Sequence, residues 1–204
     1  MIKTMGKKLE VYKDEITLSN LNIHELLTLA SIIELEGAGS DDRAGVAGVF
    51  YNRIDAGWTL GSDVTTYYGV QKNFNKDLSW SNLKACNGYN TRAESSCPIK
   101  GLPVGPICSP SLNSISSTIE PKKNDYFYFV ADKNKKTYFS KTYNEHTKVV
   151  SNLKKEGLWY QYYKEFTKAF KSEERNKKIS KTESVLDTLD TASTILKIDR
   201  KSVV

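Results

Sequence analysis

Residues 26–37 read Leu-Leu-Thr-Leu-Ala-Ser-Ile-Ile-Glu-Leu-Glu-Gly, and this stretch decides the fold of the chain. Its apolar residues recur at helical spacing on more than one face, which predicts a helix buried nearly all round. Glu34 and Glu36 end the predicted helix, and Gly37 follows them. Charged side chains are rare inside buried elements. The two carboxylates therefore indicate a site at the C-terminal end of this helix.

Burial and the negative end of the helix dipole both disfavour a charged carboxylate, so we expect a raised pKa at this site. A protonated glutamate on a rigid helix is suited to act as a general acid. The alternative is that both residues only mark the point where the chain returns to solvent. Helical geometry leaves the choice of residue open, because Glu34 and Glu36 lie about 80° to either side of the apolar stripe at about 100° per residue.

The composition describes an ordinary globular protein that can bury one core and carry a small appendage. The chain has 204 residues, of which 39% are hydrophobic and 26% charged. Its formal net charge of +6 is compatible with nucleic acid, anionic lipid or an acidic wall polymer, and favours none of them. No run of about 18 apolar residues is present. The N-terminus lacks the apolar region of a signal peptide, so we expect any export signal or anchor to be missing from this sequence.

The three cysteines predict one disulfide and one free thiol. Cys86 and Cys97 bracket a segment rich in Gly, Asn and Ser, and we expect them to pair in an oxidising compartment, which leaves Cys108 free. A three-cysteine zinc site is the competing interpretation, but the close paired spacing that zinc requires is missing. Residues 24–28 are one ligand short of the zinc-protease pattern, since Thr28 stands where the second histidine must be. We therefore expect no metal and no cofactor.

The pattern along the chain predicts an α+β fold that is rich in helices and contains a small β-hairpin. Residues 86–110 form a long Gly- and Pro-rich connection, and connections of this length are often functional. We expect Gly45 and Gly48 to let the second helix pack closely against the first. The first predicted helix runs from a cap at Ser19 or Asn20 to Gly37, the second from Ser40–Asp42 to Gly57, and the third begins with a cap at Asp63. Three further helices are predicted at 79–83, 111–119 and 142–156, and two strands at 126–130 and 137–140.

Three regions follow from these elements. We expect residues 1–20 to be a loose polar lead-in and residues 21–158 to form the folded domain. Residues 159–204 are charged and low in branched aliphatic side chains, so we expect an appendage that is partly helical or disordered.

Several motifs in unbroken order resemble one family, the YceG-like endolytic murein transglycosylases (MltG), over about residues 24–157. No single motif would suffice, and their order makes the resemblance specific. The motifs are LASIIELE at 29–36, VAGVFYNR at 46–53, SDVTTYYG at 62–69, YNT at 89–91, GLPVGPI at 101–107, YFYFVAD at 126–132 and YFSKTYNEH at 138–146.

The resemblance implies a lytic-transglycosylase-type catalytic domain with a long loop that lines its cleft. Such an enzyme cuts peptidoglycan glycan strands between MurNAc and GlcNAc and leaves 1,6-anhydroMurNAc ends. The family pattern places the catalytic glutamate on Glu36, the choice that helical geometry leaves open. The residues implied in binding or shaping the glycan cleft are Asn52, Asp63, Tyr89, Asn90, Thr91, Gly101, Leu102, Pro103 and His146.

The resemblance also implies where the protein works and with what. The expected substrate is peptidoglycan on the extracytoplasmic face of a bacterial cell membrane, and the expected partners are cell-wall synthesis or division proteins. Nucleic acid is not an expected partner, because the sequence carries no recognised nucleic-acid motif. Members of the family usually begin with a membrane anchor and a LysM-like domain, and we expect this sequence to correspond to the catalytic domain alone.

Two other functions remain open at this stage. The first is a two-carboxylate muramidase, a hydrolase in which Glu36 is the acid and Asp63 or Glu34 its partner. The second is a non-catalytic module that binds peptidoglycan without cutting it.

The sequence also departs from the family pattern at one place. Residues 92–100, which include Cys97, look like an insertion beside the cleft that alters substrate fit.

Overall fold

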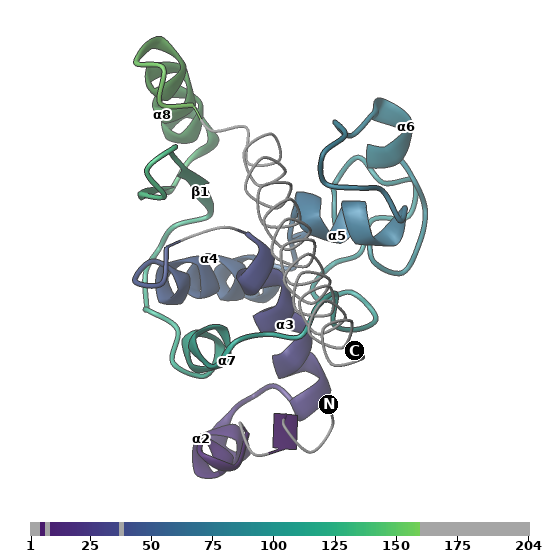
Figure 1. Cartoon of the computed structure of the whole chain (residues 1–204), viewed down its shortest axis with the longest axis vertical. Helices are drawn as coiled ribbons and strands as arrows, with labels where there is room; N and C mark the ends of the chain where they lie inside the picture. The colour runs from purple at the N-terminus through teal and green to yellow at the C-terminus, as the bar shows by residue number, and fades with distance from the viewer. Residues whose placement is uncertain (1–4, 7–8, 37–38, 160–204) are drawn as a thin grey trace, which may run out of the picture. The chain divides into compact units, whose positions relative to one another are not determined.

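The structure is a computed structural model that describes residues 5–6, 9–36 and 39–159 (Figure 1). Of the predicted appendage at 159–204, only Trp159 falls within the described residues. None of the described helices is long and apolar enough to cross a membrane. The elements are α2 (Lys13–Leu18), α3 (Ile23–Leu35), α4 (Arg43–Asp55), α5 (Asp63–Gly69), α6 (Trp80–Leu83), α7 (Leu112–Ile119), β1 (Tyr128–Ala131), β2 (Thr137–Ser140) and α8 (Tyr143–Lys155).

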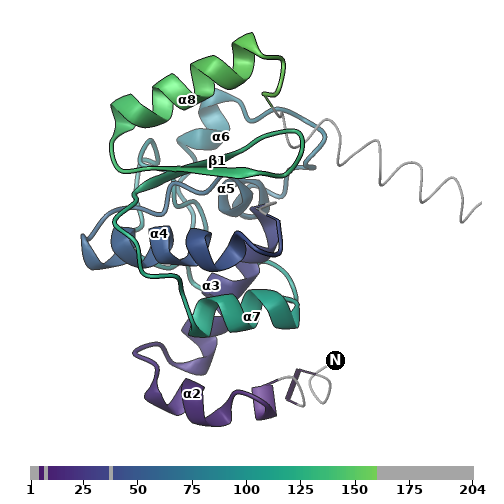
Figure 2. The same cartoon turned by 90° about the vertical axis from the view of Figure 1, so that its left-hand side faces the viewer.

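Helix α3 is the central element, as its apolar sequence predicts. It contacts α4, α5 and α7, and Leu26, Leu29, Ile32 and Ile33 are fully buried against them. Figure 2 shows the layers: α8 lies on the hairpin, the hairpin on α4, and α3 and α7 lie beneath α4. Burial on several faces explains why the helix is mostly apolar from Leu26 to Ile33. Its two buried polar residues, Thr28 and Ser31, donate their hydroxyls to backbone carbonyls of the same helix at 2.7 Å.

The chain before α3 is more ordered than predicted. Residues Lys13–Leu18 form α2, so the expectation of a loose lead-in is wrong for this segment. Ile16 packs beside Leu26 and Ile115, which makes α2 a cover for one end of α3 and α7. An apolar residue once per turn, at positions 5, 9, 12 and 16, was the available signal.

The cap of α3 also differs from the prediction. Asn22, rather than Ser19 or Asn20, is the N-cap, and it forms a capping box with Glu25. The Asn22 side chain accepts from the Glu25 N–H at 3.0 Å, and the Asn22 N–H donates to Glu25 at 2.9 Å. The helix therefore starts two or three residues later than the sequence suggested, because the preceding residues connect it to α2.

The predicted hairpin is present, with its first strand starting later than expected. Strands β1 and β2 are antiparallel, with Tyr128 opposite Ser140 and Ala131 opposite Thr137. Asp132 organises the turn between them by accepting from the N–H groups of residues 134 and 136 at 2.8 and 3.0 Å. Helix α8 runs as predicted from its N-cap Thr142 to the C-cap at residue 156.

The two helical glycines of α4 permit close packing, although the neighbour differs from the predicted one. A Cβ on Gly45 would overlap the ring of Phe139 in β2, and one on Gly48 would overlap Asn124 and the carbonyl of residue 122. The expected neighbour was α3. These glycines instead bring α4 against the hairpin and the segment that leads into it, which fixes the wall on one side of the candidate site.

Candidate active site

Glu36 is the C-cap of α3 and lies where α3 meets the start of α5. Its side chain is partly buried, and Oε1 accepts a hydrogen bond from the hydroxyl of Ser62. Ser62 is the N-cap of α5, and its own N–H donates to the hydroxyl of Thr91 at 3.2 Å. The carboxyl group is thus held through one oxygen by a serine that the rest of the fold fixes in place.

The environment of Glu36 favours its protonated form. Burial raises the pKa of Glu36 to about 7, and the charge of Asp63 adds to the rise. The hydrogen bond from Ser62 and the charges of Arg53 and Arg92 act in the opposite direction without cancelling the effect of burial. A carboxyl group with a pKa near 7 can both give and take a proton at neutral pH.

Glu34, two residues earlier, has a different environment. Its Oε2 accepts from the Ser111 N–H at 2.9 Å and from the Ser114 hydroxyl at 2.7 Å, both at the start of α7. Its Oε1 pairs with Arg43 of α4 at 3.2 Å. Burial raises the pKa of Glu34, but these donors lower it by more, so it stays below its ordinary value. Glu34 is a charged structural link among three helices.

Asp63 is close enough to Glu36 for its charge to act on it. The predicted capping role belongs to Ser62, since Asp63 is the first residue of α5 itself. Its Oδ1 pairs with Arg92 at 3.1 Å, and Arg92 also pairs with Glu94 at 3.1 Å. Burial raises the pKa of Asp63 above its ordinary value, and the charge of Arg92 offsets part of this rise.

Arg53 connects Glu36 to the hairpin. Its Nε donates to the carbonyl of Phe127 at 2.8 Å, and a second nitrogen donates to the carbonyl of Leu60. Its guanidinium lies over the ring of Tyr128, 5.4 Å from the centroid. Burial lowers the pKa of Arg53 below its ordinary value, and the charge of Glu36 offsets part of this drop. This cation therefore stands between the carboxyl group and the aromatic side of the hairpin.

His146, which the resemblance implies in binding or shaping the glycan cleft, contacts the same Tyr128 ring over which Arg53 lies. Its ring stacks on Tyr128 with centroids 5.6 Å apart, and burial together with Arg53 lowers its pKa, which favours neutral imidazole. Within the described residues its buried Nδ1 has no hydrogen-bond partner. His146 is thus linked to the Glu36 region through Tyr128 and Arg53.

Two of the residues implied in binding or shaping the glycan cleft, Asn90 and Thr91, are fully buried. Asn90 donates to the carbonyls of residues 83 and 85 at 2.9 and 2.7 Å and accepts from the Thr66 hydroxyl at 2.7 Å. The hydroxyl of Thr91 lies 2.8 Å from that of Thr65. These side chains fix the loop that carries their neighbours, which fits a role in shaping the cleft.

Asn52 is also occupied within the protein. Its amide nitrogen donates to the carbonyls of Asn124 and Tyr126 at 3.0 and 2.9 Å. These bonds join α4 to the segment before β1. Asn52, implied in binding or shaping the glycan cleft, therefore holds the hairpin on α4.

The glycine-rich turn after residue 100 supports the same region. Gly101 has a φ of 83°, and its N–H donates to the carbonyl of Trp58 at 3.2 Å. Leu102 packs against the core and Pro103 is buried. Tyr89, also implied in binding or shaping the cleft, lines the pocket described next.

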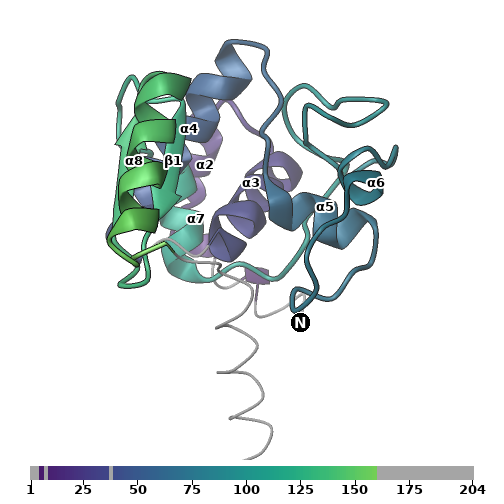
Figure 3. The same ribbon diagram turned by 90° about the horizontal axis from the view of Figure 1, so that it is seen from above.

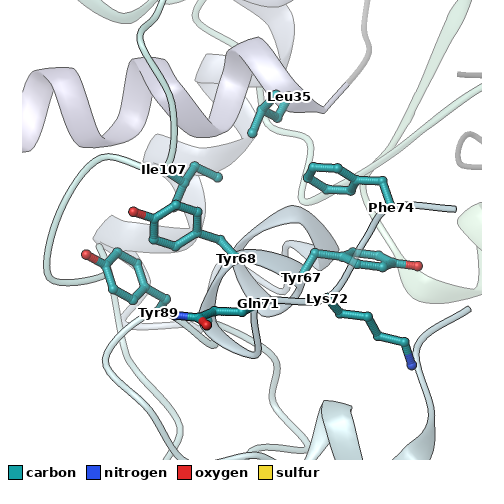
Figure 4. Close-up of a pocket in the computed structure, with 9 residues that line it drawn as sticks. Leu35, Tyr67, Tyr68, Gln71, Lys72, Phe74, Tyr89 and Ile107 are labelled. Atoms are coloured by element: carbon teal, nitrogen blue, oxygen red, sulfur yellow. The ribbon is translucent and has the colours of Figure 1, made fainter. Parts of the chain in front are cut away.

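A pocket of about 470 Å³ opens beside Leu35, the residue next to Glu36 (Figure 4). Glu36 itself does not line the pocket, so its carboxyl group lies outside the pocket. Figure 3 shows the setting: α5 and α6 lie on one side of α3, and the hairpin and α8 on the other. The lining residues are Leu35, Tyr67, Tyr68, Gly69, Gln71, Lys72, Phe74, Tyr89 and Ile107.

The cysteines are arranged as predicted, because Cys86 and Cys97 form a disulfide with their Cα atoms 5.3 Å apart. Cys108 is free and half-buried, and burial raises its pKa to about 11. Across the described part of the chain, no group of three or more His, Cys, Asp or Glu side chains is placed to hold a metal ion.

Sequence reasoning missed Ser62 and Arg92. Ser62 precedes Asp63 in the quoted SDVTTYYG motif, and a serine next to a candidate carboxylate was the available signal. Arg92 falls in the segment that looked like an insertion, and no signal in the sequence connected it to Asp63.

The sequence pattern of the YceG-like family matches residues 1–152. The chain belongs to the YceG-like family. An endolytic murein transglycosylase of Bacillus subtilis is 36% identical over 148 residues, which cover 72% of this chain and 39% of that protein. One from Streptococcus pneumoniae R6 is 36% identical over 152 residues, which cover 74% of this chain and 27% of that protein.

A solved structure agrees with the family assignment. The crystal structure of a YceG-like protein from Listeria monocytogenes matches with a TM-score of 0.65 and 36% identity, covering 73% of this chain and 47% of that one. The α+β fold predicted from the sequence is therefore confirmed. The chain spans less than half the length of each of these relatives.

Proposed function

We propose that this YceG-like chain is an endolytic lytic transglycosylase of peptidoglycan, with Glu36 as its one acid and base. The observation that carries the proposal is the state of Glu36: a carboxyl group on the buried helix, held by Ser62, with a pKa of about 7. The names of the curated relatives, which are endolytic murein transglycosylases, supply the substrate class.

One residue of this kind is sufficient for the reaction. Protonated Glu36 gives its proton to the glycosidic oxygen as the bond between that oxygen and C1 of MurNAc breaks. The carboxylate left behind takes the proton from the C6 hydroxyl of the same sugar, and O6 forms a bond to C1. The product carries a 1,6-anhydro ring, Glu36 regains its proton, and no water is consumed. The pKa near 7 serves both steps.

Hydrolysis is the second candidate, because the charge of Asp63 acts on Glu36. A muramidase needs a second carboxylate to activate water or to attack C1. Asp63, paired with Arg92, is available for that task, whereas the bonds of Glu34 to α7 and Arg43 argue against Glu34. The two reactions differ in product, since hydrolysis leaves a reducing end.

Mass spectrometry of glycan strands incubated with the protein tests the proposal. Wild type is expected to yield products one water lighter than hydrolytic ones, and Glu36→Gln is expected to yield none while remaining folded. Reducing-end products would transfer the assignment to the hydrolase. Binding of strands without turnover by wild type would favour a non-catalytic module.

The location and partners follow from this substrate. We propose that the domain works on the extracytoplasmic side of the membrane, where peptidoglycan lies, and meets cell-wall synthesis or division proteins there. The Cys86–Cys97 disulfide supports an oxidising location, because such bonds seldom persist in the cytosol.

A further inference from the structure

The pocket beside Leu35 has a chemical character different from that of the Glu36 region. Two pairs of rings form its walls: Tyr68 meets Tyr89 with centroids 4.7 Å apart, and Tyr67 meets Phe74 at 5.1 Å (Figure 4). Leu35 points into the space from above, as the same view shows. These walls can take methyl and methylene groups.

The polar groups of the pocket favour a negatively charged ligand. Its nine lining residues include one lysine and no aspartate or glutamate. Lys72 is partly buried, and its Nζ donates to Oδ1 of Asn82 at 2.7 Å, which holds the ammonium in place. An ammonium carries three donors, so a ligand carboxylate can share it with Asn82. Gln71 adds a side-chain amide.

The position of the pocket connects it to the proposed reaction. Leu35 lines the pocket and precedes Glu36, so the two sites are separated by one step along the backbone. In peptidoglycan, the MurNAc sugar whose C1 is attacked also carries a short peptide on its lactyl group. That peptide contains alanine methyl groups, amide bonds and free carboxylates, which match the walls and the cation of the pocket.

We propose that this pocket binds the stem peptide of a MurNAc residue at or next to the scissile bond, with Lys72 facing a peptide carboxylate. The proposal rests on the proposed function, because it assumes that a peptidoglycan strand lies at Glu36. It assigns a specificity role to the pocket: the enzyme prefers strands that still carry peptides over strands that an amidase has stripped.

The first experiment compares two substrates of equal strand length, one with stem peptides and one without. For wild type, KM is expected to be lower on peptide-bearing strands. Lys72→Met removes the ammonium and keeps the aliphatic stem, and Asn82 still accepts from Ser79. We expect this variant to shrink the KM ratio between the substrates by about tenfold.

Lys76→Met is the matched control, because Lys76 is exposed in the same connection between α5 and α6 and does not line the pocket. It is expected to keep the wild-type ratio. Equal KM values for both substrates with wild type, or an equal rise on both with Lys72→Met, would overturn the proposal. The second result would indicate that the pocket holds a sugar.

A binding measurement separates this proposal from the proposed function. An isolated L-Ala-γ-D-Glu-L-Lys-D-Ala peptide is titrated by NMR into wild type and into Lys72→Met. Shifts at the pocket residues of wild type, with about tenfold weaker binding by the variant, support the pocket even if no strand is cut. Absence of binding to wild type at millimolar peptide would overturn it, whereas cleavage by Glu36→Gln would overturn only the proposed function.

Discussion

Two glutamates at one end of α3 have opposite electrostatic states. Glu34 is surrounded by donors from α7 and by Arg43, which keep its pKa below the ordinary value. Glu36 has Ser62 as its hydrogen-bond donor and Asp63 nearby, and its pKa rises to about 7. Burial raises the pKa at both sites. The difference has two causes: Glu36 lies in the more desolvated environment, and Glu34 has more hydrogen-bond donors around it.

The most direct test of the difference between Glu34 and Glu36 is to replace each carboxyl group by an amide, one at a time. Glu36→Gln is expected to lower kcat by about 10³-fold or more, because an amide can neither give nor take the proton. Glu34→Gln is expected to stay within about tenfold of wild type at a temperature where it is folded. Strand cleavage followed by chromatography measures both, and equal losses would show that the two sites are not distinct.

The second prediction concerns stability, for which the larger effect is expected at Glu34 and not at Glu36. Glu34→Ala is expected to lower the free energy of unfolding by about 2–3 kcal/mol, because it removes the partner of the partly buried Arg43. Urea denaturation measures this loss. Glu36→Ala is the paired control and should cost less, since Glu36 accepts from Ser62, whereas Glu34 accepts from two serines and Arg43. A larger loss for Glu36→Ala would contradict the structural role of Glu34.

The third prediction concerns pH. The raised pKa means that the folded protein holds a proton on Glu36 that the unfolded chain releases, so stability falls as pH rises from about 4.5 to about 7. Glu36→Gln removes this loss. Its Tm relative to wild type should therefore increase over that window and level off above it, as scanning calorimetry at several pH values can measure. A Tm difference that does not change with pH would argue against the raised pKa.

The smallest expected effect belongs to Ser62. Its hydrogen bond lowers the pKa of Glu36, so Ser62→Ala should raise that pKa further and shift the alkaline limb of the kcat/KM profile to higher pH. Ser62→Thr keeps the hydroxyl and should leave the limb near its wild-type position. A purely structural role for Ser62 would change the rate without moving the limb.

Local sequence signals predicted the elements whose ends depend on nearby residues. Thr142 and Glu145 form the capping box of α8 three residues apart, and Gly157 follows its C-terminus with a φ of 66°. The start of β1 was placed two residues early at Tyr126, because aromatic content continues outside the paired strand. Periodicity also predicted that Glu34 and Glu36 lie at the C-terminal end of this helix, and both lie at the end of α3.

The identity of the proton-carrying glutamate was beyond local signals. The donors that keep Glu34 charged come from Ser111 and Ser114, which are 77 and 80 residues away in the sequence. The burial of Asn90 was equally beyond local signals, since its partners become visible only once α5 and the loop are placed. The family resemblance supplied the choice of Glu36, and the structure gives a physical account of it.

The Cys86–Cys97 disulfide has a consequence for when the site is assembled. It closes the loop that holds Asn90, Thr91 and Arg92, and these residues brace α5 next to Glu36. A newly made chain in a reducing cytosol has this loop open, and the bond forms only after the chain reaches an oxidising environment. At the proposed extracytoplasmic location, the disulfide would therefore fix the residues around the carboxyl group only after the chain has left the cytosol.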